Sequence, residues 1–176
     1  MKHTGRFIGA GLLGVALFGG AATTTLSGAG CVTEADRAPR DVACPSEVDW
    51  PIVSQVLEKS CGTQDCHGAP ARPLRLYGRN GVRLSKDSIV GQGATTADEL
   101  AQNRDSVCGL EPELMAAVVT GDGDVDTLTV TRKPRLLEAH KGGRVWLDAS
   151  PGWTCFQSWL DGAVDQAACE ADLQLP

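Results

Sequence analysis

Apolar residues recur at helical spacing in four stretches of the chain, and these stretches predict four helices. The first begins at Pro51, after the candidate N-cap Asp49, and continues for about ten residues until the polar sequence CGTQDCHG ends it. The second runs from 97 to about 107, where Thr96 and Glu99 have the spacing of a capping box. The first helix is amphipathic, so it should bury one face in the core.

The third and fourth predicted helices lie in the second half of the chain. Residues 111–119, with the sequence EPELMAAVV, carry a proline and acids in the first turn and are followed by Gly121. The last helix begins at Pro151 after the candidate N-cap Ser150 and ends at Gly162. Its apolar stripe consists of large side chains: Trp153, Phe156, Trp159 and Leu160.

The segments between these helices predict loops rather than a sheet. Residues 68–94 contain short alternating runs broken by glycines, which favour loops with at most a small hairpin. Residues 128–134 (LTVTRKP) predict a short extended run that Pro134 stops, and a glycine-rich loop follows it. The expected fold class is therefore mostly α: a small helical domain with long loops.

The N-terminus has the pattern of an export signal. Lys2 and Arg6 precede an apolar run at 7–22, and small polar residues follow that run without a cationic flank. The run is shorter than the ~20 apolar residues of a membrane-spanning helix. Residues 1–30 are therefore interpreted as a signal peptide that is removed on export.

The signal segment ends in LSGAGC, which resembles the lipobox of bacterial lipoproteins, and this resemblance implies that Cys31 is lipidated. Cleavage by ordinary signal peptidase near this point is the alternative. Both interpretations predict an exported protein in the periplasm or cell envelope, and the first anchors it to a membrane. The polar sequence at 31–48 then predicts a flexible tether before a single domain at 49–176.

Composition adds two constraints. The chain has 16 basic and 22 acidic residues, and removal of Lys2 and Arg6 with the signal leaves 14 against 22, a formal charge of −8. This acidic balance argues against nucleic-acid binding. Only six aromatic residues follow the signal, so the core needs reinforcement by disulfides or by a buried cofactor.

Seven cysteines in an exported chain indicate covalent chemistry. With Cys31 set aside as the anchor, six remain, and three disulfides would use all of them. Cys61 and Cys66 differ from the rest because His67 follows directly, which gives the motif C-x4-C-H. The common haem attachment motif is C-x-x-C-H, in which two thiols bond the haem vinyl groups and the histidine binds the iron. This chemistry requires the second cysteine and the histidine to be adjacent, whereas extra residues between the cysteines can loop outward.

The sequence VDWPIVSQVLEKSCGTQDCHG resembles the first helix and haem motif of cytochrome c domains in bacterial exported lipoproteins. HKGG, followed by WTCFQSWLDGA, resembles the distal loop and final helix of a related branch, so the resemblance covers about residues 48–165. It implies a cytochrome c-like domain with covalent haem c and its iron, in which Cys61 and Cys66 form thioethers and His67 is the proximal ligand. The four-residue spacing between the cysteines departs from the usual motif.

Few side chains are available for the other face of such a haem. After the signal, the second histidine is His140 and the only methionine is Met115. His140 lies in a loop before the last helix, where cytochrome c domains place their distal ligand, so the resemblance implies ligation by His67 and His140. Met115 lies at helical spacing among apolar residues and is the alternative distal ligand. Two histidine ligands predict a lower reduction potential than a His/Met pair.

In the haem interpretation, two disulfides remain for the other four cysteines: Cys44, Cys108, Cys155 and Cys169. We expect Cys155 to pair with either Cys108 or Cys169. The cationic side chains that could face haem propionates, or merely water, are four arginines: Arg72, Arg75, Arg79 and Arg83.

The sequence therefore predicts a non-enzymatic, monohaem electron-transfer lipoprotein whose partners are other redox proteins, which the sequence does not identify. The alternative is a non-enzymatic lipoprotein without haem, a disulfide-stapled binding or structural module in which Cys61 is bonded to Cys66. Export suits both, because haem attachment and disulfide formation take place outside the cytoplasm.

Overall fold

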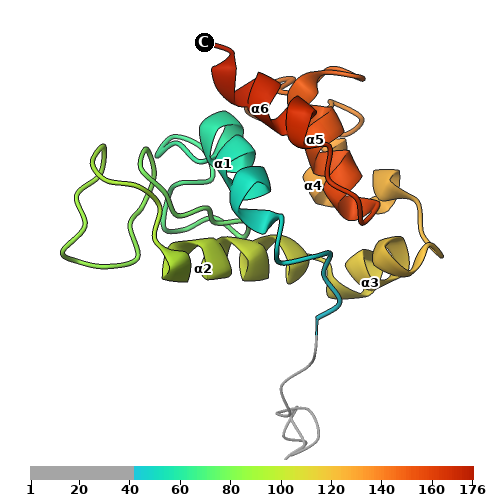
Figure 1. Cartoon of the computed structure of the whole chain (residues 1–176), viewed down its shortest axis with the longest axis horizontal. Helices are drawn as coiled ribbons and strands as arrows, with labels where there is room; N and C mark the ends of the chain where they lie inside the picture. The colour runs from blue at the N-terminus through green and yellow to red at the C-terminus, as the bar shows by residue number, and fades with distance from the viewer. Residues whose placement is uncertain (1–41) are drawn as a thin grey trace, which may run out of the picture. The chain divides into compact units, whose positions relative to one another are not determined.

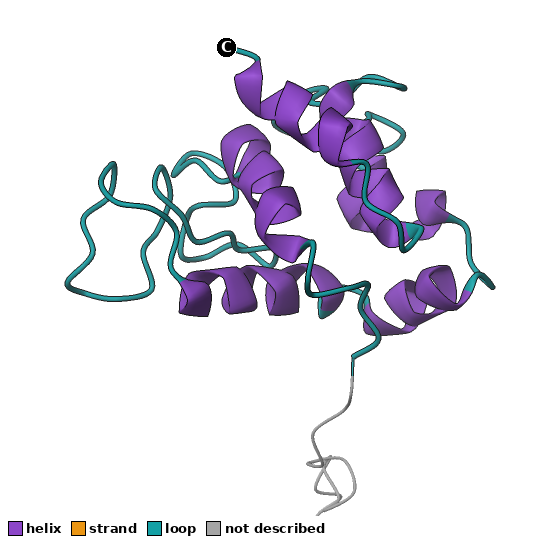
Figure 2. Cartoon of the chain, viewed as in Figure 1, coloured by secondary structure: helices purple, strands orange, loops and turns teal. Residues whose placement is uncertain are grey.

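The computed structural model describes residues 42–176, so the expected signal peptide, Cys31 and most of the expected tether lie outside the described residues. The described part is mostly helical, with 44% helix and no strand between 42 and 176, which confirms the expected mostly α class (Figure 1, Figure 2). Its elements in chain order are α1 (Trp50–Cys61), α2 (Ala97–Cys108), α3 (Pro112–Thr120), the 3-10 helix η2 (Val125–Thr127), α4 (Thr129–Arg132), α5 (Pro151–Leu160) and α6 (Gln166–Gln174).

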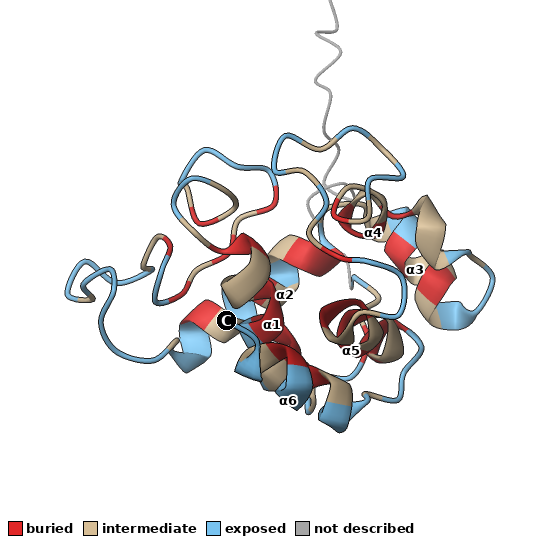
Figure 3. Cartoon of the chain, turned by 90° about the horizontal axis from the view of Figure 1, so that it is seen from above, coloured by how far each residue is buried: buried red, intermediate tan, exposed pale blue. Residues whose placement is uncertain are grey.

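The core lies where α1 packs against α2, α5 and α6. Few aromatic residues are present, but most of them gather here. The rings of Trp50 on α1 and Trp159 on α5 have centroids 4.7 Å apart, and Phe156 packs between Trp159 and Trp146 at 5.7 and 5.5 Å. Figure 3 shows buried faces on α1 and α5. Concentrating the aromatic side chains in one cluster gives a small domain a continuous core.

Two disulfides reinforce this core, formed by the four cysteines that the haem interpretation leaves for such bonds. Cys44 is bonded to Cys108 at the end of α2, and Cys155 on α5 is bonded to Cys169 on α6. The second pairing is one of the two expected for Cys155. Arg104 donates to the carbonyl of Pro45 at 2.9 Å. The Cys44 bond and this contact tie the last part of the expected tether to α2.

The predicted helices at 51, 97, 111 and 151 are all present, with bounds that differ by a residue or two at their ends. The capping box at the start of α2 is complete: the Thr96 hydroxyl accepts from the Glu99 amide, and the Glu99 carboxylate accepts from the Thr96 amide. Asp49 precedes α1 as expected, but its side chain makes no capping hydrogen bond.

The expected extended run at 128–134 is wrong, because Thr129–Arg132 form α4. Threonine and valine favour strands locally, but a distant residue decides the conformation here. The Glu111 carboxylate accepts from the amide and the hydroxyl of Thr129 at 2.6 and 2.8 Å, which satisfies donors in the first turn of α4. This contact joins α4 to the start of α3.

Helix α6 was not among the predicted helices. Asp165 begins it as an N-cap, since its carboxylate accepts from the Ala168 amide at 2.9 Å. The bond from Cys169 to α5 and the packing on α1 then hold the helix in place. Its sequence has a weak apolar stripe, so tertiary contacts rather than periodicity stabilise it.

The long segment between α1 and α2 contains no strand and only an isolated bridge between Tyr77 and Val82, so no hairpin forms there. Side chains of α2 hold it instead. Asn103 accepts from the Tyr77 amide at 2.6 Å and donates to the Tyr77 carbonyl at 2.8 Å, and Arg83 pairs with Glu99. Polar groups of the loop are thereby satisfied by a buried helix face.

Within residues 42–176, every helix falls short of the length and apolar character that crossing a membrane requires.

Candidate functional site

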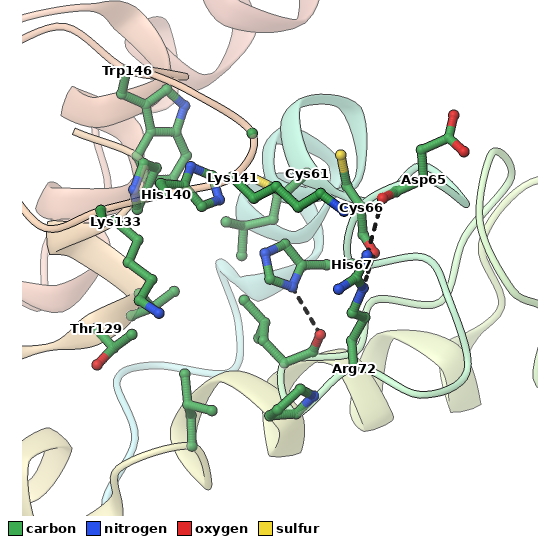
Figure 4. Close-up of a pocket in the computed structure, with 18 residues that line it drawn as sticks. Cys61, Asp65, Cys66, His67, Arg72, Thr129, Lys133, His140, Lys141 and Trp146 are labelled. Atoms are coloured by element: carbon green, nitrogen blue, oxygen red, sulfur yellow. Dashed lines mark hydrogen bonds between the residues drawn. The ribbon is translucent and has the colours of Figure 1, made fainter. Parts of the chain in front are cut away.

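A cavity of about 450 Å³ lies where the end of α1, residues 65–74, α4 and residues 139–146 meet. Its volume falls within the roughly 300 to 1,000 Å³ that is usual for sites of small molecules and cofactors. Many of its walls are apolar, with contributions from Leu57, Leu74, Val130 and Trp146. Figure 4 shows that four of the predicted site residues line this one cavity: Cys61, Cys66, His67 and His140.

Cys61 and Cys66 are the two cysteines within residues 42–176 that form no disulfide. Cys61 is the last residue of α1 and is buried, and burial, together with the charges of Cys66 and Asp172, raises the pKa of its thiol to about 12. Cys66 is half-buried. The third disulfide expected in the alternative without haem is not formed, and both thiols instead contribute to the cavity wall.

His67 is held by the backbone on both sides. Its amide donates to the Cys61 carbonyl at 2.9 Å, and its carbonyl accepts from the Leu76 amide at 2.8 Å. The next residue, Gly68, packs so closely that an added Cβ would lie 2.1 Å from the Gly62 carbonyl oxygen. No side chain fits there, so the backbone beside His67 is fixed between two other segments.

The ring of His67 has one nitrogen occupied and one free to bind a ligand. Nδ1 lies 3.0 Å from the Leu74 carbonyl oxygen, and because a carbonyl only accepts, Nδ1 carries the proton. Burial, followed by the positive charges nearby, lowers the pKa of the imidazole despite this hydrogen bond. The neutral ring thus keeps an unprotonated Nε2, which is the form that binds metal ions.

His140 has the same arrangement on a different segment. Its Nδ1 lies 2.8 Å from the Gly143 carbonyl oxygen, so that nitrogen is again the donor. Gly143 has a φ of +73°, which favours glycine, and the amides of Val145 and Trp146 close the loop by donating to the Pro134 carbonyl at 2.8 and 3.0 Å. Short-range backbone contacts therefore set the orientation of this ring too.

The two imidazoles face each other across the cavity (Figure 4). Their ring centroids are 6.3 Å apart and their planes differ by 14°. Two imidazoles that bind one metal ion from opposite sides, each through one nitrogen at about 2.0 to 2.1 Å, have centroids roughly 6 Å apart. The centroid spacing fits such a pair, in which each ring must turn the edge that carries Nε2, not its face, toward the ion.

The side chains of the cavity include the kinds that hold a covalent haem. Among residues 42–176, no group of three or more His, Cys, Asp or Glu side chains is arranged to hold a metal ion. Two histidines suffice for haem iron, because the porphyrin nitrogens supply the in-plane ligands. The residues present therefore match haem, with two thiols and two imidazoles on one apolar cavity.

Three cationic side chains surround this cavity: Arg72, Lys133 and Lys141 (Figure 4). Arg72 is held by hydrogen bonds to the Cys66 and Asp65 carbonyls at 3.0 and 3.2 Å. The sequence analysis proposed Arg72 as a partner for haem propionates but did not propose either lysine. The one sequence signal for them is adjacency, since Lys133 precedes Pro134 and Lys141 follows His140. The other three arginines have partners elsewhere: Arg75 with Tyr77, Arg79 with Gly91 and Arg83 with Glu99.

Met115, the alternative distal ligand, lies on α3 with 1% of its surface exposed and is part of the hydrophobic core. It does not line the cavity that His67 and His140 share. The packing therefore favours a role for Met115 as a core residue rather than as a ligand.

Comparison with known protein families, curated proteins and solved structures found no match to this chain.

Proposed function

We propose that this protein is a haem-binding electron-transfer lipoprotein with one covalently attached haem, similar to c-type cytochromes. The observation that carries the proposal is the pair of imidazoles, His67 and His140, whose rings lie 6.3 Å apart and nearly parallel across a cavity that both free thiols also line. His140 lies outside the motif C-x4-C-H, so its position opposite His67 adds an observation that the motif does not contain.

The two free thiols would hold the haem covalently. In thioether formation each S–H adds across a vinyl double bond, so a sulfur–carbon bond forms and the hydrogen goes to the other vinyl carbon. Cys61 and Cys66 are suited to this role because the remaining cysteines of the described part are consumed as disulfides. Attachment through two bonds keeps the group in place without a large binding surface.

His67 and His140 would hold the iron through Nε2. When bound, the haem supplies a one-electron ferric/ferrous couple. The carbonyls of Leu74 and Gly143 fix each ring by accepting from Nδ1, and such partners also raise the basicity of the ligating nitrogen. Rings held this way need little rearrangement when an electron arrives. Ligation by two histidines favours a lower reduction potential than ligation by His and Met.

The walls of the cavity would complete the site. Apolar side chains such as Leu57 and Trp146 exclude water from the ring system, and Arg72, Lys133 and Lys141 supply positive charge for the two propionates. Transfer of electrons would take place with other redox proteins, outside the cytoplasm, in the periplasm or cell envelope. In this proposal Cys31 anchors the chain to a membrane.

The test is expression of the full chain with the cytochrome maturation machinery, followed by a pyridine haemochrome spectrum and a mass measurement. The expected result is one covalent haem per chain, with a six-coordinate low-spin spectrum. His140→Ala should convert the spectrum to high spin, while the control Met115→Leu, a buried residue outside the cavity, should leave it unchanged.

Absence of covalent haem from that material refutes the proposal. A mass that has instead lost six hydrogens, from three disulfides, would support the disulfide-stapled binding or structural lipoprotein. A high-spin spectrum in Met115→Leu, with an unchanged spectrum in His140→Ala, would overturn the ligand assignment alone.

A further inference from the structure

A carboxylic acid is buried beside the candidate haem cavity and is only partly hydrogen-bonded. Asp172 on α6 has 7% of its surface exposed, and its Oδ2 has no hydrogen-bond partner within the described part of the chain. Its carboxyl receives a hydrogen bond from the Gly152 amide at the start of α5. A buried carboxylate with an unsatisfied oxygen costs stability, so its presence calls for an explanation.

Two residues that line the cavity lie next to this carboxyl. The charge of Asp172 contributes to the raised pKa of the Cys61 thiol. A Cβ added to Gly152 would lie 2.5 Å from Asp172 Oδ1 and 2.7 Å from Trp146 Nε1. Both side chains therefore lie close to Gly152 and to each other. Cys61 and Trp146 both form part of the cavity wall. Asp172 therefore lies directly behind the wall where the Cys61 thioether would form.

The surroundings of Asp172 leave its charge poorly compensated. Burial raises the pKa of its carboxyl, and the charge of Lys59 on α1 and the Gly152 amide oppose this only in part. Lys59 directs its ammonium group to the backbone carbonyls of Asp172 and Leu175 rather than to the carboxylate. Among residues 42–176, the Trp146 indole N–H has no partner either. The groups that face the carboxyl are thus Lys59 and Cys61 on α1, the Gly152 amide and the Trp146 indole.

We propose that Asp172 is a redox-linked proton site: it takes up one proton from solvent when the iron held by His67 and His140 gains one electron, and it releases the proton on re-oxidation. This inference rests on the proposed haem function. The electron comes from a reduced donor protein, and the proton bonds to a carboxylate oxygen of Asp172. One negative charge added at the iron is thereby balanced by one positive charge added behind the cavity wall.

The physical cause is linkage between two charges in a poorly solvated region. An added electron makes a nearby buried carboxylate harder to ionise, and a protonated carboxyl makes the iron easier to reduce by the same factor. For unit charges in a protein interior at separations of roughly 10 Å, this factor is about tenfold.

The test is a spectroelectrochemical titration of the haem-loaded full chain across a series of pH values. The midpoint potential of the wild type should fall as pH rises through the interval in which Asp172 ionises, which lies above the ordinary aspartate pKa of about 4. Asp172→Asn should abolish this dependence, because an amide takes up no proton. Glu170→Gln, which removes an exposed acid from the same helix, is the matched control and should keep it.

Retention of the wild-type pH dependence in Asp172→Asn, or a flat profile in the haem-loaded wild type, overturns this inference and leaves the haem proposal intact. A wild-type protein without covalent haem defeats both. Should Asp172→Asn fail to fold, an infrared redox difference spectrum of the wild type decides. Isotope labelling of aspartate separates the bands of aspartate carboxyls from those of the propionates and of Glu58. A labelled protonated-carboxyl band must appear on reduction, and its absence overturns the inference.

Discussion

The most heavily bonded buried charge in the described chain is the carboxylate of Glu99, and its removal should destabilise the fold in a pH-dependent way. Its side chain is 1% exposed and forms a two-pronged pair with Arg83, at 2.8 and 2.9 Å. It also accepts from the amides of Leu84 and Thr96 at 3.0 and 2.9 Å. These bonds fasten the loop before α2 to the helix. Glu99→Gln removes the charge with little change in volume.

The magnitude follows from the pKa of this group. Burial alone would raise the pKa of Glu99, but the hydrogen bonds from Arg83 and the two amides lower it from 4.5 to about 2. Because each unit is worth about 1.4 kcal/mol, the ionised carboxylate contributes about 3 kcal/mol to the free energy of unfolding. A folded-state pKa below the unfolded one means that this contribution is complete above pH ~5 and is lost as pH falls toward 2.

Urea unfolding at a series of pH values and constant ionic strength measures the effect. At pH 7 we expect Glu99→Gln to be less stable than the wild type by about 3 kcal/mol, with a difference that shrinks as pH approaches 2. Glu113→Gln, at an exposed position on α3, is the matched control and should match the wild type. A difference of the same size at both ends of the pH range would refute this reasoning.

Two further predictions concern the stability of the helical domain. Replacing Cys44 and Cys108 together with serine opens a bond that spans 64 positions and should lower the free energy of unfolding by about 2 to 5 kcal/mol, measured by urea titration; no change would mean that the bond is dispensable. Burial raises the pKa of Glu58 on α1, so the stability it contributes is present at low pH and declines as pH rises through the folded-state value. The melting temperature of Glu58→Gln should therefore fall less between acid and neutral pH than that of the wild type. An equal fall in the two proteins contradicts this.

Local sequence signals predicted the helices that begin with a capping residue or a proline. Thr96 and Glu99 form the capping box that their spacing indicates, and prolines open α1, α3 and α5. Helices that depend on distant partners escaped prediction. Helix α4 needs the Glu111 carboxylate, 18 positions earlier, and α6 needs the bond to Cys155. Neither partner can be read from periodicity.

The residues of the candidate site likewise fall into those that a local signal predicts and those that depend on distant contacts. The motif C-x4-C-H predicted Cys61, Cys66 and His67 because adjacency is local. His140 was predicted from the scarcity of other ligands together with the resemblance of its loop to the distal loop of cytochrome c domains. Lys133 and Lys141 line the cavity and Asp172 lies behind its wall, near Cys61, but none of the three belongs to a motif. Their roles depend on burial and on neighbours far away in the sequence.

Orientation and separation of the two imidazoles have different physical origins. Each ring is oriented by a carbonyl close in sequence, seven positions from His67 and three from His140. Their 6.3 Å separation depends instead on how the segment after α4 packs against the end of α1. Orientation should therefore survive changes that loosen the core, whereas separation should not. Under the haem proposal, such a site would keep its two imidazoles oriented in the folded protein and would lose iron ligation through opening of the fold rather than through rotation of a side chain.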